Sequence, residues 1–220
     1  MGHWIELDTA HGAVAGWRAG PSGKPRGALV VVQEIFGINA HIRSVVDRFA
    51  SAGFVTIAPA LFDPVERDMA LNYDDAGVAK GRDLAAALGF DRAVALAGRA
   101  ADLLQSQGLR AGVVGYCWGG TIALLCNTRL GLPAVSYYGS RSTAFLHEPT
   151  RAPMLFHFGQ HDALIPPEAV AAHRAHHPEA TLHIYPAGHG FNCDARADFS
   201  PNSAALAWQR STAFFDEALR

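Results

Sequence analysis

The sequence alternates short apolar runs with longer amphipathic segments, and this alternation carries most of its structural information. Ala28–Val32 is a continuous apolar run, a pattern typical of a strand that is covered on both faces. Trp4–Leu7 and Ala13–Arg18 flank a turn at Gly12 and predict an edge hairpin. Further strands are predicted at Phe54–Ala58, Ala111–Val114, Pro133–Tyr138, Met154–Phe158 and Thr181–Tyr185.

Helices are predicted where apolar residues recur every three to four positions. In His41–Ala52 the apolar positions follow this spacing, and Gly53 ends the segment. Residues 60–72 look like a loop, and two helices are expected to follow it before the next strand. The remaining helices are predicted at Asp74–Leu88, Asp91–Gln107, Trp118–Arg129, Pro167–His176 and Ala204–Leu219.

The order of these elements predicts the fold class. Strands that alternate with helices imply crossover connections and a mainly parallel sheet. The N-terminal hairpin adds an antiparallel edge to that sheet. We therefore expect an α/β protein, a three-layer αβα sandwich. Residues 1–220 are expected to form one domain, because no linker or repeat interrupts them.

Composition removes several classes of protein. Half of the 220 residues are hydrophobic and 18 basic residues nearly balance 20 acidic ones, which excludes a disordered chain and argues against nucleic-acid binding. No segment has the roughly 20 apolar residues that span a bilayer, and the first residues do not resemble a signal peptide. Three cysteines are too few for a disulfide framework, so we expect free thiols and a cytoplasmic location.

The clearest chemical signal lies between a predicted strand and a predicted helix. Gly115-x-Cys117-x-Gly119 matches the nucleophile elbow, a strained turn in which glycines let the two elements pack closely. The turn also puts the sulfur at a helix N-terminus, where the partial positive charge favours a thiolate. The alternative is a buried structural cysteine, an interpretation that suits Cys126 inside the following helix better.

A nucleophile needs a base, and in this fold class the chain order is nucleophile, acid, histidine. Asp162 and His189 each follow a predicted strand, at the edge where parallel sheets place their sites. With Cys117 they predict a triad in which the carboxylate orients the imidazole. The rivals are His161 and His183 for the base, and Asp194 and Asp198 for the acid.

The expected oxyanion hole is formed by two backbone N–H groups. One belongs to Trp118, directly after the nucleophile, and the other to Ile35, in the loop after the strand Ala28–Val32. Glu34 stands at the end of this buried strand, where an unpaired charge is costly. A solvated loop acid is the alternative interpretation of Glu34.

Three segments carry motifs that are specific to one protein family. Gln33–Asn39 reads Gln-Glu-Ile-Phe-Gly-Ile-Asn, Gly115–Gly120 reads Gly-Tyr-Cys-Trp-Gly-Gly, and Gly188–Phe191 reads Gly-His-Gly-Phe. In this order they resemble the dienelactone hydrolase (carboxymethylenebutenolidase) family, and the resemblance runs from about Gly12 to the final helix. It implies the α/β-hydrolase fold.

The resemblance also implies an activity, the hydrolysis of lactone or ester bonds. Cys117 would attack the carbonyl group and form an acyl-thioester, which water activated by His189 would then hydrolyse. Asp162 would be the acid of the triad, and Glu34 would hold and activate Cys117. The resemblance implies no metal and no organic cofactor, and the only expected partner is the small-molecule substrate.

Substrate recognition is where the chain departs from this family. Its dienelactone-cleaving members grip the substrate carboxylate with two arginines, one of them shortly after the catalytic histidine. Here Cys193 stands at about that position and Arg196 follows three residues later. Lys80 or Arg82 is the expected other cation, and Tyr138, at a strand end, is a further candidate to face the substrate.

Two alternative functions stay open at this point. One is a broad carboxylesterase or thioesterase without carboxylate recognition, and the other is a non-catalytic redox- or ligand-binding relative. A net charge of −2 supplies no attractive field, so any preference for an anionic substrate needs locally placed cations. We expect a monomer, with a weak dimer as the alternative.

The remaining histidines and cysteines suggest weaker possibilities. His173, His176 and His177 have a helical spacing that could hold a metal, but no clear carboxylate or thiol accompanies them, so we expect a solvated helix surface. A redox pair between Cys193 and Cys117 is a minor alternative.

Overall fold

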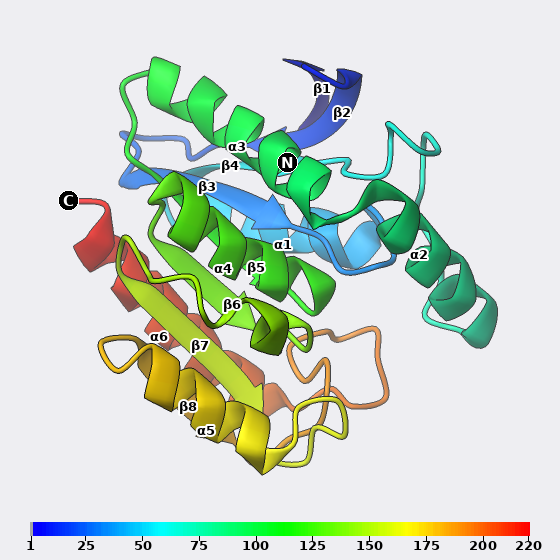
Figure 1. The fold of residues 1–220 in the computed structure, drawn as a ribbon. Coiled ribbons are helices and arrows are strands. Elements are labelled where there is room, and N and C mark those ends of the chain that lie inside the picture. The colour runs from blue at the N-terminus through cyan, green and yellow to red at the C-terminus, as the bar shows by residue number, and fades with distance from the viewer. Residues whose placement is uncertain (1) are drawn as a thin grey trace.

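The computed structural model describes residues 2–220, which form one eight-stranded sheet with helices on both faces (Figure 1). The strands are β1 (His3–Thr9), β2 (Gly12–Ala19), β3 (Gly27–Val32), β4 (Phe54–Pro59), β5 (Ala111–Tyr116), β6 (Ala134–Tyr137), β7 (Met154–Gly159) and β8 (Thr181–Tyr185). The helices are α1 (Ala40–Ser51), α2 (Asp75–Leu88), α3 (Phe90–Ser106), α4 (Trp118–Leu130), α5 (Pro167–His176) and α6 (Pro201–Ala218), with a 3₁₀ turn η1 (Ser142–Phe145).

The strand order is β1-β2-β4-β3-β5-β6-β7-β8. β1 pairs with β2, and β2 with β4, in antiparallel fashion, and every pair from β4–β3 to β7–β8 is parallel. Figure 1 shows α3, α4 and α5 in front of the sheet and α1 and α6 behind it. The predicted αβα sandwich with an antiparallel N-terminal edge is confirmed.

The continuous apolar runs are the inner strands. Every residue of β3, β4, β5, β6 and β7 is buried, because helices cover both faces of the sheet there. β8 is an edge strand whose one partner among residues 2–220 is β7, and Thr181 and Ile184 of this strand are exposed. The central strands are therefore more stably packed than this edge strand.

The helices are held against the two faces of the sheet by packing. On the rear face the ring of Phe49 in α1 lies 4.4 Å from that of Trp208 and 6.3 Å from that of Phe215, both in α6. On the front face α4 is buried on every side from Trp118 to Thr128, as expected for a helix without a polar stripe. A helix packed this tightly gives its first residues a fixed position.

The predicted element boundaries differ from the structure by a few residues. β5 extends through Tyr116, two residues further than its apolar run, and α6 begins at Pro201, since proline is well suited to the first helical turn. The turn η1 was not predicted. Between residues 2 and 220 no helix is both long enough and apolar enough to cross a membrane.

Candidate active site

Cys117 occupies the turn between β5 and α4 in a conformation that few residues adopt. Its backbone angles are φ 54° and ψ −117°, a strained combination for a residue with a side chain. A Cβ atom on Gly119 would lie 2.5 Å from the carbonyl oxygen of Val32, and one on Gly115 would overlap the carbonyl group of Gly119. The two glycines of the motif are therefore required by close packing, as the elbow pattern predicts.

The structure brings the three predicted triad side chains together. Nε2 of His189 lies 3.1 Å from the sulfur of Cys117, and Nδ1 of the same ring lies 2.8 Å from Oδ2 of Asp162. The second carboxylate oxygen, Oδ1, accepts a hydrogen bond from the N–H of Leu164 at 2.8 Å. The Asp162 side chain is fully buried, whereas Cys117 is partly accessible. The sulfur can therefore meet a substrate while the acid stays away from water.

These contacts decide the charge of the imidazole. Burial alone would lower the pKa of His189, but the hydrogen bonds and charges of Asp162 and Cys117 raise it to about 10. The two partners thus stabilise the charged form of the ring more than burial opposes it. Nε2 of the ring lies 3.1 Å from the sulfur, so the geometry allows a proton to pass between the two atoms.

Glu34 is held by a polar cluster and is not a solvated loop acid. Its side chain is fully buried, Oε2 accepts a hydrogen bond from the Tyr73 hydroxyl at 2.7 Å, and Oε1 accepts one from Nη1 of Arg196 at 3.5 Å. Burial lowers the pKa of Arg196, but the charges of Glu34 and Cys117 outweigh this effect and raise it. Arg196 thus reaches the buried Glu34 carboxylate.

A cleft of about 740 Å³ opens at Cys117. Cys117 contributes to its wall, together with Ile35 and Trp118, the two residues predicted to supply oxyanion N–H groups. The carbonyl oxygen of Ile35 abuts Gly81 of α2, where a Cβ atom would overlap it, so α2 packs directly on the Ile35 loop. The rest of the wall is formed by Arg82, Asp83, Ala85, Ala86, Phe90, Ser140, Arg141 and Leu164.

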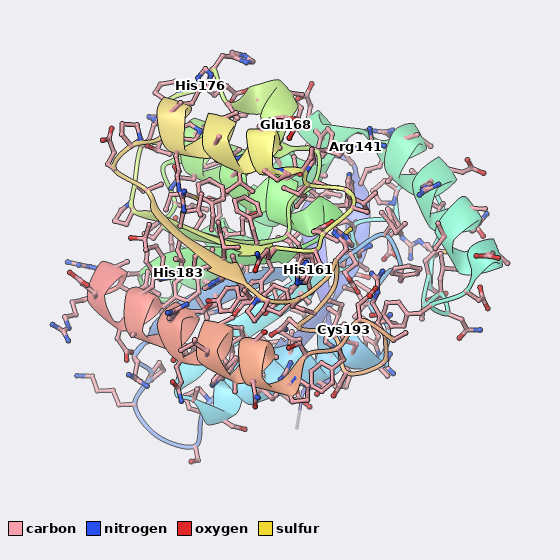
Figure 2. The ribbon with its side chains drawn as sticks, turned by 90° about the horizontal axis from the view of Figure 1, so that it is seen from below. Arg141, His161, Glu168, His176, His183 and Cys193 are labelled. Atoms are coloured by element: carbon pink, nitrogen blue, oxygen red, sulfur yellow. The ribbon has the colours of Figure 1, made fainter. Side chains whose placement is uncertain are left out.

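The cations predicted to bind substrate have different positions. Arg82 lines the cleft, whereas Lys80 is paired with Glu66 and does not. Arg141, labelled in Figure 2, is an exposed cleft residue that sequence reasoning missed. It belongs to the loop after β6, and the only sequence signal for it is this place at the carboxyl edge of the sheet.

Tyr138 does not line the cleft. Its φ angle is 40°, and its buried ring lies 5.1 Å from that of His189 and 5.4 Å from that of Phe191. It therefore packs against the imidazole, so the prediction that it faces the substrate is not supported by its position.

The rival histidines and acids lie elsewhere. His161 is exposed, and His183 lies in β8, where its ring stacks on that of His157 at 6.0 Å (Figure 2). Asp194 faces His41, with Oδ1 3.2 Å from Nδ1, and Asp198 is exposed. The contact with Cys117 belongs to His189.

The prediction of a solvated histidine surface on α5 is wrong for two of its three residues. His173 and His177 are buried, and only His176 is exposed, at the outer end of α5 in Figure 2. The reason is tertiary: the ring of His173 packs 5.0 Å from Phe156 and 4.9 Å from Phe158 of β7. Burial lowers the pKa of both histidines.

The other two cysteines are buried free thiols. Cys126 lies within α4, as expected for a core residue. Burial, followed by the charge of Glu34, raises the pKa of Cys193 to about 11. Within residues 2–220 one group of side chains has the donor types and spacing of metal ligands, namely Glu34, His41 and Cys193.

Comparisons with known proteins give the family and support the fold. The family model described as "Dienelactone hydrolase family" matches residues 14–219. Carboxymethylenebutenolidase 1 of Cupriavidus pinatubonensis is 31% identical over 207 residues, covering 83% of this chain and 82% of its own. A Synechocystis sp. protein with a provisional carboxymethylenebutenolidase name is 30% identical, covering 87% of this chain and 86% of its own.

A solved structure gives the same result. The structure from Klebsiella pneumoniae subsp. pneumoniae MGH 78578, which carries a provisional dienelactone hydrolase name, superimposes with a TM-score of 0.86. It is 28% identical and covers 98% of each chain. With the family model matching nearly the whole length, the chain belongs to the dienelactone hydrolase family of α/β-hydrolases.

Proposed function

We propose that this protein hydrolyses small-molecule esters or lactones with Cys117 as the nucleophile. The observation that carries the proposal is the imidazole of His189, which lies 3.1 Å from the Cys117 sulfur and 2.8 Å from Asp162. One base that faces a nucleophile and is oriented by an acid is the arrangement that covalent hydrolases use. The partly accessible sulfur lines a cleft that has room for a substrate.

In the first half of the reaction the Cys117 thiolate attacks the carbonyl carbon, with its proton on His189. The tetrahedral oxyanion accepts hydrogen bonds from the N–H groups of Trp118 and Ile35. Its collapse breaks the C–O bond, and the imidazolium gives its proton to the leaving alkoxide. In a lactone this new hydroxyl group stays attached to the acyl chain on the sulfur.

The second half regenerates the enzyme. Water attacks the thioester carbonyl while the neutral imidazole of His189 takes its proton. Collapse of this intermediate breaks the C–S bond, releases the carboxylic acid and restores the thiolate–imidazolium pair. Asp162 keeps the ring in place throughout, because its carboxylate binds Nδ1 and leaves Nε2 free for both proton transfers.

Glu34 and Arg196 form the second polar element of the proposed site. The Glu34 carboxylate is fully buried and is bound by Arg196 and Tyr73. We assign Glu34 the role of holding and activating Cys117. This assignment is supported by Arg196, because the charges of Glu34 and Cys117 both raise the pKa of its guanidinium.

The proposed substrate carries a carboxylate. Arg82 and Arg141 both line the cleft that holds Cys117, so an anionic group can be bound away from the reacting carbonyl. The carboxymethylenebutenolidase names of the relatives favour a dienelactone-like molecule. A neutral ester is the second candidate, because Phe90, Trp118 and Leu164 give the same cleft apolar walls. The three free thiols suit a reducing cytoplasm.

The nucleophile is tested by substitution and by trapping. Cys117→Ala is expected to lower kcat/KM for a neutral nitrophenyl ester by at least about 10³-fold, because the covalent route is lost. Mass spectrometry of the wild type, quenched during turnover, should show the acyl adduct on the peptide that contains Cys117. Cys126→Ala, which removes a buried thiol from the helix that follows Cys117, is the matched control and should keep kcat unchanged. Hydrolysis that survives Cys117→Ala would overturn the proposal.

A further inference from the structure

A second cluster of reactive side chains lies behind the proposed catalytic residues. Glu34 follows β3 and His41 is in the first turn of α1. Cys193, labelled in Figure 2, is in the loop that leads into α6. All three are buried. A ring nitrogen of His41, the sulfur of Cys193 and a carboxylate oxygen of Glu34 lie within 4.8 Å of one another. Three elements that are distant in sequence thus bring three different ligand types to one point.

His41 has an unused ring nitrogen. Nδ1 faces Oδ1 of Asp194 at 3.2 Å, whereas Nε2 is buried and has no hydrogen-bond partner among residues 2–220. A buried nitrogen without a partner is costly, and native structures rarely keep one without a reason. A carboxylate on Nδ1 fixes the proton there and leaves the lone pair of Nε2 free. Metal-binding histidines are oriented in this way by a second carboxylate.

The donor set identifies the kind of ligand. A thiolate, an imidazole and a carboxylate are the three donors that zinc uses in proteins, with bonds of about 2.0–2.3 Å. Around a tetrahedral ion such bonds place donor atoms between about 3 and 4 Å apart. The 4.8 Å limit of the cluster is compatible with this geometry after small side-chain movements. Three protein ligands would leave the fourth position for water.

We propose that Glu34, His41 and Cys193 form a zinc-binding site, and that zinc bound there inhibits hydrolysis by immobilising Glu34. Zn²⁺ replaces the proton of the Cys193 thiol, which passes to the buffer, and no electron is transferred. The inhibitory part rests on the proposed function, because it assumes that Glu34 acts on Cys117. The binding part does not rest on it.

The neighbours of Glu34 set the strength of binding. Tyr73 donates to Oε2 and Arg196 donates to Oε1, but each carboxylate oxygen has a second lone pair for a metal. The Arg196 guanidinium repels a divalent ion. The site therefore binds zinc more weakly than closed structural sites with four protein ligands, which suits a reversible inhibitor.

Binding is tested with Co²⁺, which reports its ligands by absorption. The test uses Cys117→Ala protein, so that the Cys117–His189 pair cannot supply the thiolate. A near-ultraviolet thiolate-to-cobalt band, removed by added Zn²⁺, is expected in this background. The band should vanish with Cys193→Ser and persist with Cys126→Ser, a buried thiol elsewhere in the chain. A missing band, or one unchanged by Cys193→Ser, would overturn the site.

A substitution at an exposed residue tests the same site without the risk that the variant fails to fold. Asp194 has a side chain that is 64% exposed, so Asp194→Asn should leave the fold intact. It removes the carboxylate that orients His41, and metal affinity should fall about 10-fold or more. Equal Co²⁺ affinity in the Cys117→Ala and Cys117→Ala/Asp194→Asn proteins would contradict the assigned role of His41.

Inhibition is measured separately in the protein with its native Cys117. Zn²⁺ should inhibit ester hydrolysis, and Cys193→Ser should raise the half-inhibitory concentration at least about 10-fold. Equal inhibition of both proteins would refute control through Glu34, even if the cobalt band were present. If the Cys117→Ala protein shows no cobalt band while the wild type has normal Cys117-dependent turnover, the metal site is refuted and the proposed function stands.

Discussion

Nη1 of Arg196 donates to Oε1 of Glu34 at 3.5 Å, so a carboxylate with a fully buried side chain has a cation from a loop 162 residues away in sequence. This pair connects the end of β3 with the loop before α6.

Arg196→Gln should lower the free energy of unfolding by about 1–3 kcal/mol. It leaves Glu34 buried with Tyr73 as its remaining partner, and a buried charge without its counterion is costly. The expected loss of stability is smaller than for a short, fully buried ion pair, because the Arg196 side chain is 22% exposed. Urea unfolding measures the change. Arg174→Gln, an exposed site on α5, should change stability by less than about 0.5 kcal/mol.

Two glycine-to-alanine substitutions should have opposite signs. In Gly119→Ala the new Cβ would lie 2.5 Å from the carbonyl oxygen of Val32, so the turn at Cys117 must shift. We expect the free energy of unfolding to fall by about 3 kcal/mol or more and the activity to be lost. In Gly98→Ala, within α3, the Cβ meets only the tip of the Leu130 side chain at 2.9 Å. Higher helix propensity should stabilise that variant by about 0.5–1 kcal/mol. Thermal unfolding of both variants checks the contrast, and a stable, active Gly119→Ala protein would contradict it.

The two cleft arginines should select anionic substrates. Arg82→Gln and Arg141→Gln are each expected to raise KM for a carboxylate-bearing lactone about 5–30-fold, the loss of one or two charge-assisted hydrogen bonds. KM for a neutral nitrophenyl ester should stay within about 2-fold of the wild-type value, because no charge is being bound. Lys80→Gln serves as the control, since Lys80 pairs with Glu66 outside the cleft. Equal effects on both substrates would mean that the arginines support the structure rather than select the substrate.

The buried histidines of α5 should make the protein sensitive to acid. Burial lowers the pKa of His173 and His177 below the ordinary value of about 6.5. Below that pH the unfolded chain binds more protons than the native state, so the free energy of unfolding falls as pH decreases. His173→Phe should reduce this slope between pH 7 and 5, by at most about 1.4 kcal/mol per pH unit.

The control for this prediction is the neighbouring exposed residue. His176→Gln, at the outer end of α5, should keep the wild-type pH dependence in urea unfolding measurements. If His173→Phe had the same slope as the wild type, protonation of His173 would not be a cause of acid destabilisation.

The triad was predictable from sequence because each of its members has a local context. The glycines around Cys117 are needed by backbone contacts a few residues away or on the adjoining strand, and Asp162 and His189 each follow a strand. Chain order then selected them among many acids and histidines. The inner strands were also predictable, because a strand that is buried on both faces is a continuous apolar run in the sequence.

The partners of side chains from separate elements could not be predicted in this way. Nothing in the first turn of α1 shows that His41 faces Glu34 and Cys193, and no motif marks Arg141. The burial of His173 depends on the aromatic face of β7, which the α5 sequence does not contain. Such contacts are fixed by packing between distant segments.

The position of β8 at the edge of the sheet has a consequence for heat inactivation. Cys117 follows the central strand β5, whereas His189 follows β8, which has one neighbouring strand and exposed residues. Partial opening of this edge would displace His189 while Cys117 stays in the intact part of the sheet. Such local openings need less free energy than global unfolding. The enzyme should therefore lose activity several degrees below its melting temperature and recover it on cooling.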